Sequence, residues 1–565
     1  MKSGGSGMTG VAKVHAAAMT LRLQLSGRLF AACGLWLVAL GVYFVLLRPA
    51  LLPEDPRFMG SSLEALRAAA PGLERWLGLV FNVMGGFMVA TGALTLLLAR
   101  RYLAGRARGT LTAMTLAGVA SVALMSATNF ALDSDFRWLL LVPALVWSAA
   151  LVCYVREGTR SGVVGVVGQR SGERRFFRDQ AFHFQTLRAL NNLRADGADT
   201  GEVLETIAHI REGDTASWYA AWEATASRVL ERTGRIGDPR SRGQALLRAH
   251  NYLRTAEFFL APSDPKRPIT FRRNVDAFEA GLDALQVRRE RTRIPLGPNH
   301  LNAIFYPPPD GSGPRPLLVF CGGFDSTLEE LYFALVPAAH ERGFSVLTFE
   351  GPGQGAVLRE QQLTFRPDWE VPTSAVLDAH FAAHPRSGKT ILIGMSMGGY
   401  LAPRAAAFDR RIDGVVAFDV LFDFGAVARS TVPAFALWLR QRRWDALLNL
   451  LIATMARLSP GFAWSVANGQ WVLGTASAME TLDVLRAYTL APVAGRIEAD
   501  VLILAGGEDH FIPTGQAADF SKALTAARSV RTIVYDRTSG GAEHCQMGAQ
   551  SLWHADLFDW IAGLD

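Results

Sequence analysis

The 565-residue chain contains only four cysteines, and their scattered spacing forms no CxxC pair or other ligand pattern. Two of the four lie inside long apolar runs. A small disulfide-stabilised fold and a zinc site are therefore not expected, and we predict no metal and no cofactor. The four are Cys33, Cys153, Cys321 and Cys545.

Charged residues are also scarce, at 19% of the chain, and the mean hydropathy is +0.17. These values indicate that part of the chain is not exposed to water. The formal net charge is +6. However, no basic stripe with interleaved aromatic residues is present, so we expect no nucleic-acid partner.

Four long runs in the first third of the chain contain no charged residue. Each is about as long as a helix that crosses a hydrocarbon core of roughly 30 Å. The alternative is a buried helical core in a soluble domain, but such helices rarely lack charge on every face for five turns. A cleaved signal peptide does not fit either, because further runs follow the first. We predict four transmembrane helices at Leu29–Leu47, Trp76–Ala99, Gly109–Leu132 and Trp138–Val155.

Basic residues mark alternate ends of these spans, whereas the loops between spans one and two and between spans three and four mix both signs. The positive-inside rule then places both termini in the cytoplasm. We therefore expect a multi-pass protein of the inner or plasma membrane with a cytoplasmic C-terminal region. No charge lies within a span, so the spans are predicted to anchor the chain rather than conduct ions. The basic residues are Lys2, Lys13, Arg22 and Arg28, then Arg100, Arg101, Arg106 and Arg108, then Arg156, Arg160, Arg170, Arg174 and Arg175.

The rest of the chain divides by composition into a linker, a helical segment and a region of short apolar strands. Apolar residues recur at three- and four-residue steps through the segment from Phe176, as in Trp218 and Trp222, and this pattern predicts helices. Three prolines between 262 and 268 are expected to close those helices. We predict a basic tail at 1–28, a membrane region at 29–155, a linker at 156–175, a helical cap at 176–290 and a catalytic domain at 291–565.

Continuous apolar runs alternate with helical stretches in the last region. Such runs predict a mostly parallel sheet covered by helices on both faces. Ligands bind such sheets beyond the carboxyl ends of the strands, where the candidate functional residues lie. The predicted strands are Leu317–Phe320, Ser345–Phe349, Thr390–Ile393, Gly414–Phe418, Val501–Leu504 and Arg531–Tyr535.

The pentapeptide GMSMG at 394–398 follows one of these strands and precedes a helical stretch. This context is the one required of a nucleophilic serine on a sharp strand-to-helix turn, where glycines avoid clashes. The pentapeptide alone is a modest signal, but with its strand and helix it predicts Ser396 as the nucleophile.

A serine nucleophile needs a base and an acid that orients the base. Asp509 follows the strand at 501–504 and His544 follows the strand at 531–535, in the chain order Ser, Asp, His. We predict Asp509 and His544 in these roles. Glu508 and Asp419 remain alternative acids, and His510 is an alternative base.

The developing negative charge on the substrate requires two backbone N–H donors. One is expected from Met397, directly after the nucleophile. The other is expected from Gly323 or Phe324, after the strand at 317–320. Glu350 ends the next strand, and we expect it to brace a turn rather than take part in catalysis.

A helical insertion at about 425–498 separates two predicted strands and contains four tryptophans. An insertion at this point is expected to cover the site as a lid, and its aromatic side chains are candidates for an apolar pocket. Core packing explains any single tryptophan better. The four are Trp438, Trp444, Trp464 and Trp471.

Several of these segments together resemble one branch of the α/β hydrolases, the group of dihydroxypseudooxynicotine hydrolase and the fungal polyketide-shortening hydrolases of pigment synthesis. Esterases of the fermentation–respiration switch type are similar at a greater distance. The resemblance covers about residues 175–565, including the helical cap. The chain departs from these relatives in its four predicted spans. The segments are FEGPGQG at 349–355, RPDWE at 366–370, GMSMGGY at 394–400 and EHCQ at 543–546.

This resemblance implies an α/β-hydrolase fold and a Ser396–Asp509–His544 triad that cleaves esters or carbon–carbon bonds beside a carbonyl. We therefore expect a membrane-anchored serine hydrolase acting through an acyl-enzyme on a small, fairly apolar molecule. A dipeptidyl or acylaminoacyl peptidase is one alternative, although such enzymes usually carry a β-propeller where this chain is helical. A non-catalytic membrane sensor built on the same fold is the other.

Overall fold

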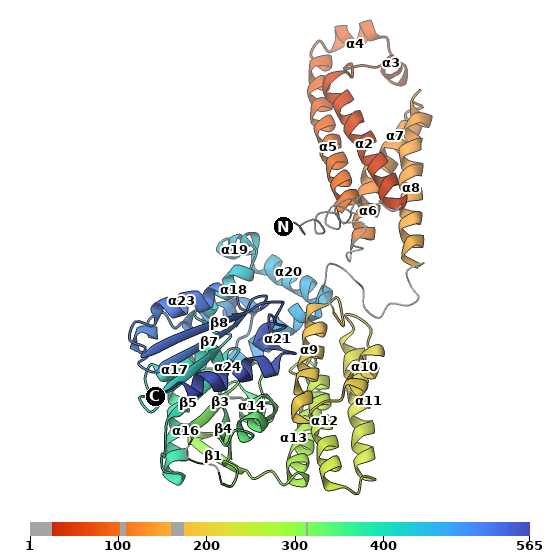
Figure 1. The fold of residues 1–565 in the computed structure, drawn as a ribbon. Coiled ribbons are helices and arrows are strands. Elements are labelled where there is room, and N and C mark those ends of the chain that lie inside the picture. The colour runs from red at the N-terminus through yellow and green to blue at the C-terminus, as the bar shows by residue number, and fades with distance from the viewer. Residues whose placement is uncertain (1–24, 102–108, 160–174, 312, 314, 565) are drawn as a thin grey trace, which may run out of the picture. The chain divides into compact units, whose positions relative to one another are not determined.

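The computed structural model describes residues 25–101, 109–159, 175–311, 313 and 315–564. These residues fall into two compact units, one on each side of residue 168 (Figure 1). Most of the predicted tail and linker lies outside the described residues. The same holds for eight of the basic residues used for orientation: Lys2, Lys13, Arg22, Arg106, Arg108, Arg160, Arg170 and Arg174.

Among its described residues, the N-terminal unit contains four helical segments long and apolar enough to cross a membrane. They match the four uncharged runs to within a few residues. The third is interrupted by one π-helical turn, and two short helices lie in the first loop. The segments are α2 (Leu25–Leu46), α5 (Leu73–Arg101), α6–η2–α7 (Thr110–Gly118, Val119–Ala123, Leu124–Ala131) and α8 (Arg137–Thr159), with α3 (Glu54–Phe58) and α4 (Leu63–Ala69).

Glycines allow α2 and α5 to pack closely. A Cβ atom on Gly41 would lie 2.6 Å from the carbonyl oxygen of Gly85. Small residues permit such backbone approach between apolar helices. The loop after α2 also contacts the loop before α8, through an ion pair of 2.9 Å between Arg57 and Asp135. These two loops therefore lie at the same end of the unit, as an alternating path through four spans requires.

The second unit begins with five helices and a 3-10 turn. Four of the helices, α9 to α12, start with an aspartate whose side chain accepts backbone N–H bonds, which satisfies donors that the first turn leaves unpaired. Trp218, Trp222 and Tyr252 are fully buried among them. The elements are α9 (Gln180–Asn191), η3 (Asn192–Ala195), α10 (Thr200–Ala208), α11 (Thr215–Thr233), α12 (Pro239–Glu257) and α13 (Lys266–Ala284).

The prediction that the prolines at 262–268 close the helical segment is wrong. Helix α13 begins at Lys266 and runs for 19 residues. Pro268 lies in its first turn, where a helix leaves backbone N–H groups unpaired and tolerates proline. The prolines therefore separate two helices.

An eight-stranded sheet follows, in the order β1-β2-β4-β3-β5-β6-β7-β8. The strands from β4 to β8 are parallel, whereas β1 and β2 pair antiparallel at one edge. All six predicted strands are present, and only the β1–β2 hairpin was not predicted. The strands are β1 (Glu290–Leu296), β2 (Asn299–Tyr306), β3 (Leu317–Cys321), β4 (Ser345–Glu350), β5 (Thr390–Met395), β6 (Gly414–Phe418), β7 (Asp500–Gly506) and β8 (Ser529–Tyr535).

Helices cover both faces of the sheet (Figure 1). One core cluster contains Val319 together with side chains of α16 and α17, and the other contains the next strand residue, Phe320, together with α14 and α24. Because successive strand residues point to opposite faces, one apolar run supplies both cores. The helices are α14 (Glu330–His340), α15 (Gly355–Gln361), α16 (Glu370–Ala383), α17 (Gly398–Ala406), α23 (Gly515–Ala523) and α24 (Gln550–Ala562), with the turn η6 (His544–Gln546).

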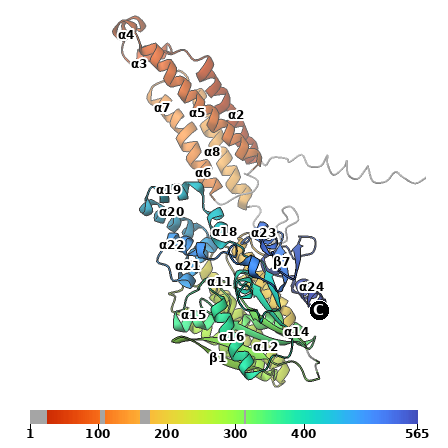
Figure 2. The same cartoon turned by 90° about the vertical axis from the view of Figure 1, so that its left-hand side faces the viewer.

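A helical insertion joins β6 to β7, where the sequence predicts a lid (Figure 2). It includes α18 (Phe424–Thr431), α19 (Ala434–Gln441), α20 (Asp445–Leu458), α21 (Pro460–Leu473) and α22 (Ala478–Val484), then the turns η4 (Leu485–Ala487) and η5 (Ala494–Arg496).

Candidate active site

Ser396 lies in the sharp turn between β5 and α17. Its φ of 61° is in the left-handed region, which side chains other than glycine rarely adopt. Its N–H donates to the carbonyl of Phe418 at 2.9 Å, which fixes the turn to the neighbouring strand. A Cβ atom on Gly394 would lie 1.9 Å from the carbonyl oxygen of Gly398, so this position of the motif requires glycine. The turn lifts the serine hydroxyl beyond the end of the sheet.

His544 lies between Ser396 and Asp509. Its Nε2 is 2.9 Å from the Ser396 hydroxyl oxygen, and its Nδ1 is 2.6 Å from an Asp509 carboxylate oxygen. The other Asp509 oxygen accepts the N–H groups of Phe511 and Ile512, at 2.7 and 3.0 Å. These bonds hold the carboxylate towards the imidazole. Three side chains separated by up to 148 positions thus form one hydrogen-bonded series.

The electrostatics of this series match its geometry. Burial opposes the charged form of His544, but the Asp509 carboxylate outweighs it and raises the imidazole pKa well above its ordinary value. Burial likewise opposes ionisation of Asp509, but His544 and the backbone donors hold its pKa below its usual range. The pair therefore favours a protonated imidazole beside an ionised carboxylate, the state that follows proton transfer from a serine.

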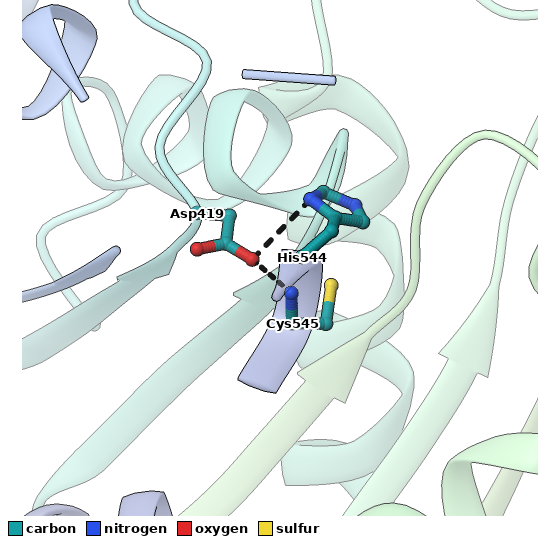
Figure 3. Close-up of side chains that lie close together, drawn as sticks. All are labelled: Asp419, His544 and Cys545. Carbon is teal, nitrogen blue, oxygen red and sulfur yellow. Dashed lines mark hydrogen bonds and ion pairs between the residues drawn. The ribbon is translucent and has the colours of Figure 1, made fainter. Parts of the chain in front are cut away.

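Asp419 is a second buried carboxylate beside His544, at the end of β6 (Figure 3). One of its oxygens accepts the Gly506 N–H at 3.0 Å, and the other accepts the Cys545 N–H and lies 3.4 Å from His544 Nδ1. Burial and the nearby Asp509 raise the pKa of Asp419 to about 6. Asp419 therefore holds the backbone that carries the histidine, at a longer distance from the imidazole than Asp509.

Asp419, His544 and Cys545 also present possible metal-ligand atoms within 4.8 Å of one another (Figure 3). Hydrogen bonds within the chain already engage the carboxylate and both imidazole nitrogens. Burial raises the pKa of the Cys545 thiol to about 12, which disfavours the thiolate that a metal would need. Hydrogen bonding therefore accounts for this cluster.

Among the described residues, the remaining alternatives Glu508 and His510 make no hydrogen bond to Ser396. Glu508 is half-exposed and pairs with Arg537 at 2.6 Å. The ring of His510 is 6.4 Å from that of His544, and burial lowers its pKa to about 4. Glu350 is buried and accepts the Asn302 amide and two backbone N–H groups, consistent with the bracing role expected from the sequence.

The predicted backbone donors lie on two segments that meet beside Ser396. A Cβ atom on Gly323 would lie 2.8 Å from Ser396 Cβ and 2.9 Å from the Met397 nitrogen, so this loop passes directly against the turn. Among the described residues, the N–H groups of Met397, Gly323 and Phe324 donate to no acceptor. They are available to a substrate oxygen.

A cavity of about 630 Å³ opens above Ser396. Helix α9, the loop after β3 and the lid insertion line it, mostly with apolar side chains. Of the four lid tryptophans, only Trp464 lines this cavity, and it stacks on Phe258 of the cap at 4.5 Å. Trp471 lines a separate cavity, and Trp438 and Trp444 are on the lid exterior. The cavity is large enough for a small organic molecule.

A buried ion-pair cluster on the wall of this cavity was not predicted. Arg188 of α9 donates to Asp325 and Glu330 at 2.5 to 2.6 Å, and Arg254 of α12 lies 3.4 Å from Glu330. Asp325 directly follows the candidate donor Phe324, so the cluster ties the cap to that loop. Its sequence signal is an arginine among the apolar residues of one helix, but the partners lie more than 130 positions away.

The sequence profile described as the alpha/beta hydrolase family matches residues 317–550. Hydrolase acrC of Aspergillus aculeatus is 33% identical over 416 residues, covering 68% of this chain and 97% of its own length. The 20-hydroxy-prefusarin hydrolase of Gibberella moniliformis is 31% identical over 407 residues, covering 68% and 96%.

Among solved structures, the 2,6-dihydroxy-pseudo-oxynicotine hydrolase is similar in fold, with a TM-score of 0.51 at 21% identity, covering 66% of this chain and 94% of its own. The sheet, the motif at 394–398 and these relatives all indicate an alpha/beta hydrolase. The chain belongs to the alpha/beta hydrolase family and is a hydrolytic enzyme.

Proposed function

We propose that this protein is a membrane-anchored serine hydrolase that cleaves an ester, or a carbon–carbon bond beside a carbonyl, in a small and fairly apolar substrate. The observation that carries the proposal is the hydrogen-bonded series Ser396–His544–Asp509 at the base of an apolar cavity. A non-catalytic sensor would not need this series.

The reaction has two stages. His544 Nε2 takes the proton as the Ser396 oxygen attacks the substrate carbonyl, and Asp509 stabilises the resulting imidazolium. The oxyanion accepts N–H bonds from Met397 and from Gly323 or Phe324. His544 then returns the proton to the departing alkoxide of an ester, or to the departing enolate carbon of a β-dicarbonyl compound. Water, activated by His544, hydrolyses the acyl-enzyme.

The lining of the cavity supports this substrate class. Phe184, Leu451 and Ile452 are among its apolar lining, and the His544 ring also lies 5.1 Å from Phe511. Such a surface favours an apolar acyl group with few polar contacts. A fungal relative named for 20-hydroxy-prefusarin supports a small organic substrate rather than a peptide.

Membrane anchoring is supported by the four long apolar helices of the N-terminal unit. We assign residues 29–155 to the membrane and residues 291–565 to the catalytic domain. The basic residues Arg100 and Arg101 follow the second span, so we propose that the catalytic domain is cytoplasmic. Protease digestion of inside-out vesicles should cleave the catalytic domain, whereas digestion of right-side-out vesicles should leave it intact.

Turnover of a p-nitrophenyl ester series and a β-diketone series tests the chemistry, with wild type compared with Ser396→Ala. We expect turnover of at least one series by the wild type, and a loss of more than a thousandfold in the variant. Cleavage of aminoacyl amides alone would favour the peptidase. Binding without turnover across both series would favour the sensor.

A further inference from the structure

The outer surface of the lid is unusually apolar. Trp444 is 52% exposed and Leu450 is 63% exposed. A monomeric soluble protein rarely presents such large apolar side chains together. We define the lid patch as the exposed apolar side chains of α19, α20 and the turn between them: Phe435, Trp438, Trp444, Leu447, Leu450 and Met455.

The lid patch has the organisation of a surface rather than of scattered residues. The ring of Trp438 stacks on that of Phe435 at 6.2 Å and meets that of Trp444 edge-on at 5.6 Å. These rings form a continuous aromatic ridge along α19 and the turn that follows.

Helix α20 is apolar on two sides. Leu448, Leu451 and Ile452 line the cavity above Ser396, whereas Leu447 and Leu450 face outward. A helix in contact with water on its outer side normally carries polar residues there. The outer side of this helix carries these leucines beside exposed polar residues, a mixture that suits a partner offering both apolar and polar groups.

Arginines border the lid patch. Arg442 lies over the Trp438 ring at 5.6 Å, and Arg443 and Arg457 are exposed. Among the described residues, none of these three guanidinium groups pairs with a carboxylate. Aromatic and leucine side chains bordered by arginines are typical of helices that lie in the interface of an anionic bilayer. A purely apolar protein partner would not use the charges.

A short segment joins the last candidate span to the unit that carries this patch. The last candidate span ends at Val155 and the first helix of the catalytic unit begins at Gln180. The 24 residues between them extend to at most about 90 Å. Two members of the lid patch, Phe435 and Met455, also line the Ser396 cavity, so the patch continues into the site.

We propose that the lid patch lies in the interfacial layer of an anionic phospholipid bilayer, and that apolar substrate passes from the lipid between α19 and α20 (Figure 2) into the cavity above Ser396. This inference rests on the proposed anchoring and on the proposed apolar substrate. It adds to these proposals a surface that contacts the membrane, a lipid partner and a route by which the substrate enters.

A fluorescent probe tests the contact. Leu450→Cys and the control Leu204→Cys, 46% exposed on cap helix α10, would each be made in full-length protein that carries Cys153→Ala. Each is labelled with a polarity-sensitive dye and placed, one copy per nanodisc, in phosphatidylcholine with phosphatidylglycerol. We expect a blue-shifted emission at position 450 that nitroxide-labelled lipids quench, and neither effect at position 204.

Emission at position 450 that the labelled lipids do not quench would overturn the proposal. A blue shift seen only in detergent at high protein concentration would instead indicate contact between two copies, and would equally overturn it. Weaker quenching in pure phosphatidylcholine is expected, because the arginines then lose their anionic partners.

Activity tests the route. Trp444 and Leu450 do not line the cavity, so Trp444→Glu with Leu450→Glu leaves the site intact. We expect hydrolysis of a long-chain ester dissolved in the bilayer to fall at least tenfold, while that of water-soluble p-nitrophenyl acetate changes less than twofold. An equal effect on both esters would overturn the route. If the proposed chemistry fails, wild type hydrolyses neither ester, and if the anchoring fails, alkaline carbonate extracts the protein. The quenching result does not depend on the proposed chemistry, and carbonate extraction reports on the anchoring separately.

Discussion

Two carboxylates lie beside His544, and substituting them separately decides which one orients the imidazole. Asp509 is 2.6 Å from Nδ1 and Asp419 is 3.4 Å from the same atom. In our account Asp509 accepts the Nδ1 proton, whereas Asp419 holds the backbone. Asp509→Asn should therefore impair catalysis, and Asp419→Asn should mainly impair stability.

The expected magnitudes differ enough to separate the two roles. Loss of the orienting carboxylate in this arrangement lowers kcat by roughly ten-thousandfold. If the Asp419 carboxylate could take the place of Asp509, the loss in kcat would come only from its longer distance to His544. At an effective dielectric constant of about 20, attractions of about 6.4 and about 4.9 kcal/mol at the two distances correspond to roughly a tenfold difference in rate. We expect a loss above a thousandfold, because Asp419 already accepts the Cys545 N–H.

Asp419→Asn directs an amide N–H₂ at a buried backbone donor. An unsatisfied buried donor costs about 1–3 kcal/mol, so the denaturant midpoint should fall while kcat falls less than tenfold. Ester turnover at saturating substrate measures kcat in both variants, and Glu508→Gln, an exposed neighbour, is the control. A loss below thirtyfold in Asp509→Asn, together with a thousandfold loss in Asp419→Asn, would refute this assignment.

Three further predictions follow from the same contacts. Since the Asp509 carboxylate raises the pKa of His544 and the reaction needs a neutral base, kcat/KM should rise with pH through a midpoint above 6.5, and Asp509→Asn should lower that midpoint. Gly323→Ala should lower kcat by roughly a hundredfold, because the new Cβ would lie 2.8 Å from Ser396 Cβ and displace a backbone donor. Arg188→Ala should destabilise the fold by about 3 kcal/mol, read from the denaturant midpoint, because it leaves buried carboxylates unpaired.

Matched variants control these measurements. Gly515→Ala, where a Cβ would meet nothing within 4 Å, should retain full activity. Arg211→Ala removes an ion pair at a side chain that is 78% exposed and should leave the unfolding midpoint nearly unchanged. A midpoint for kcat/KM below 6.5 in wild type would contradict the pH argument. Equal losses of kcat in Gly323→Ala and Gly515→Ala would contradict the packing expected at Gly323. Equal shifts of the unfolding midpoint in Arg188→Ala and Arg211→Ala would contradict the role of the buried ion pairs.

The parts of the fold that the sequence predicts are those with local periodic signals. Uncharged runs predict the four long helices, and continuous apolar runs predict all six parallel strands. The β1–β2 hairpin was not predicted. Gly297 lies at its turn with a left-handed φ of 59°. Its first strand, Glu290–Leu296, is mostly exposed, so no continuous apolar run marks it.

The candidate site also has parts that the sequence predicts and parts that it does not. The grouping of Ser396, Asp509 and His544 could be predicted because each follows a recognisable strand and the chain order is fixed by the fold. The sequence could not exclude Asp419 in place of Asp509, because both residues follow strands. Only their distances to His544 separate the two carboxylates. The cluster around Arg188 depends on contacts between distant segments, which periodicity does not report.

Covalent labelling of the full-length protein by a fluorophosphonate identifies the nucleophile. We expect one adduct, located by peptide mass spectrometry on Ser396, and no adduct in Ser396→Ala. An adduct on a different residue, or labelling that persists in the variant, would contradict this assignment.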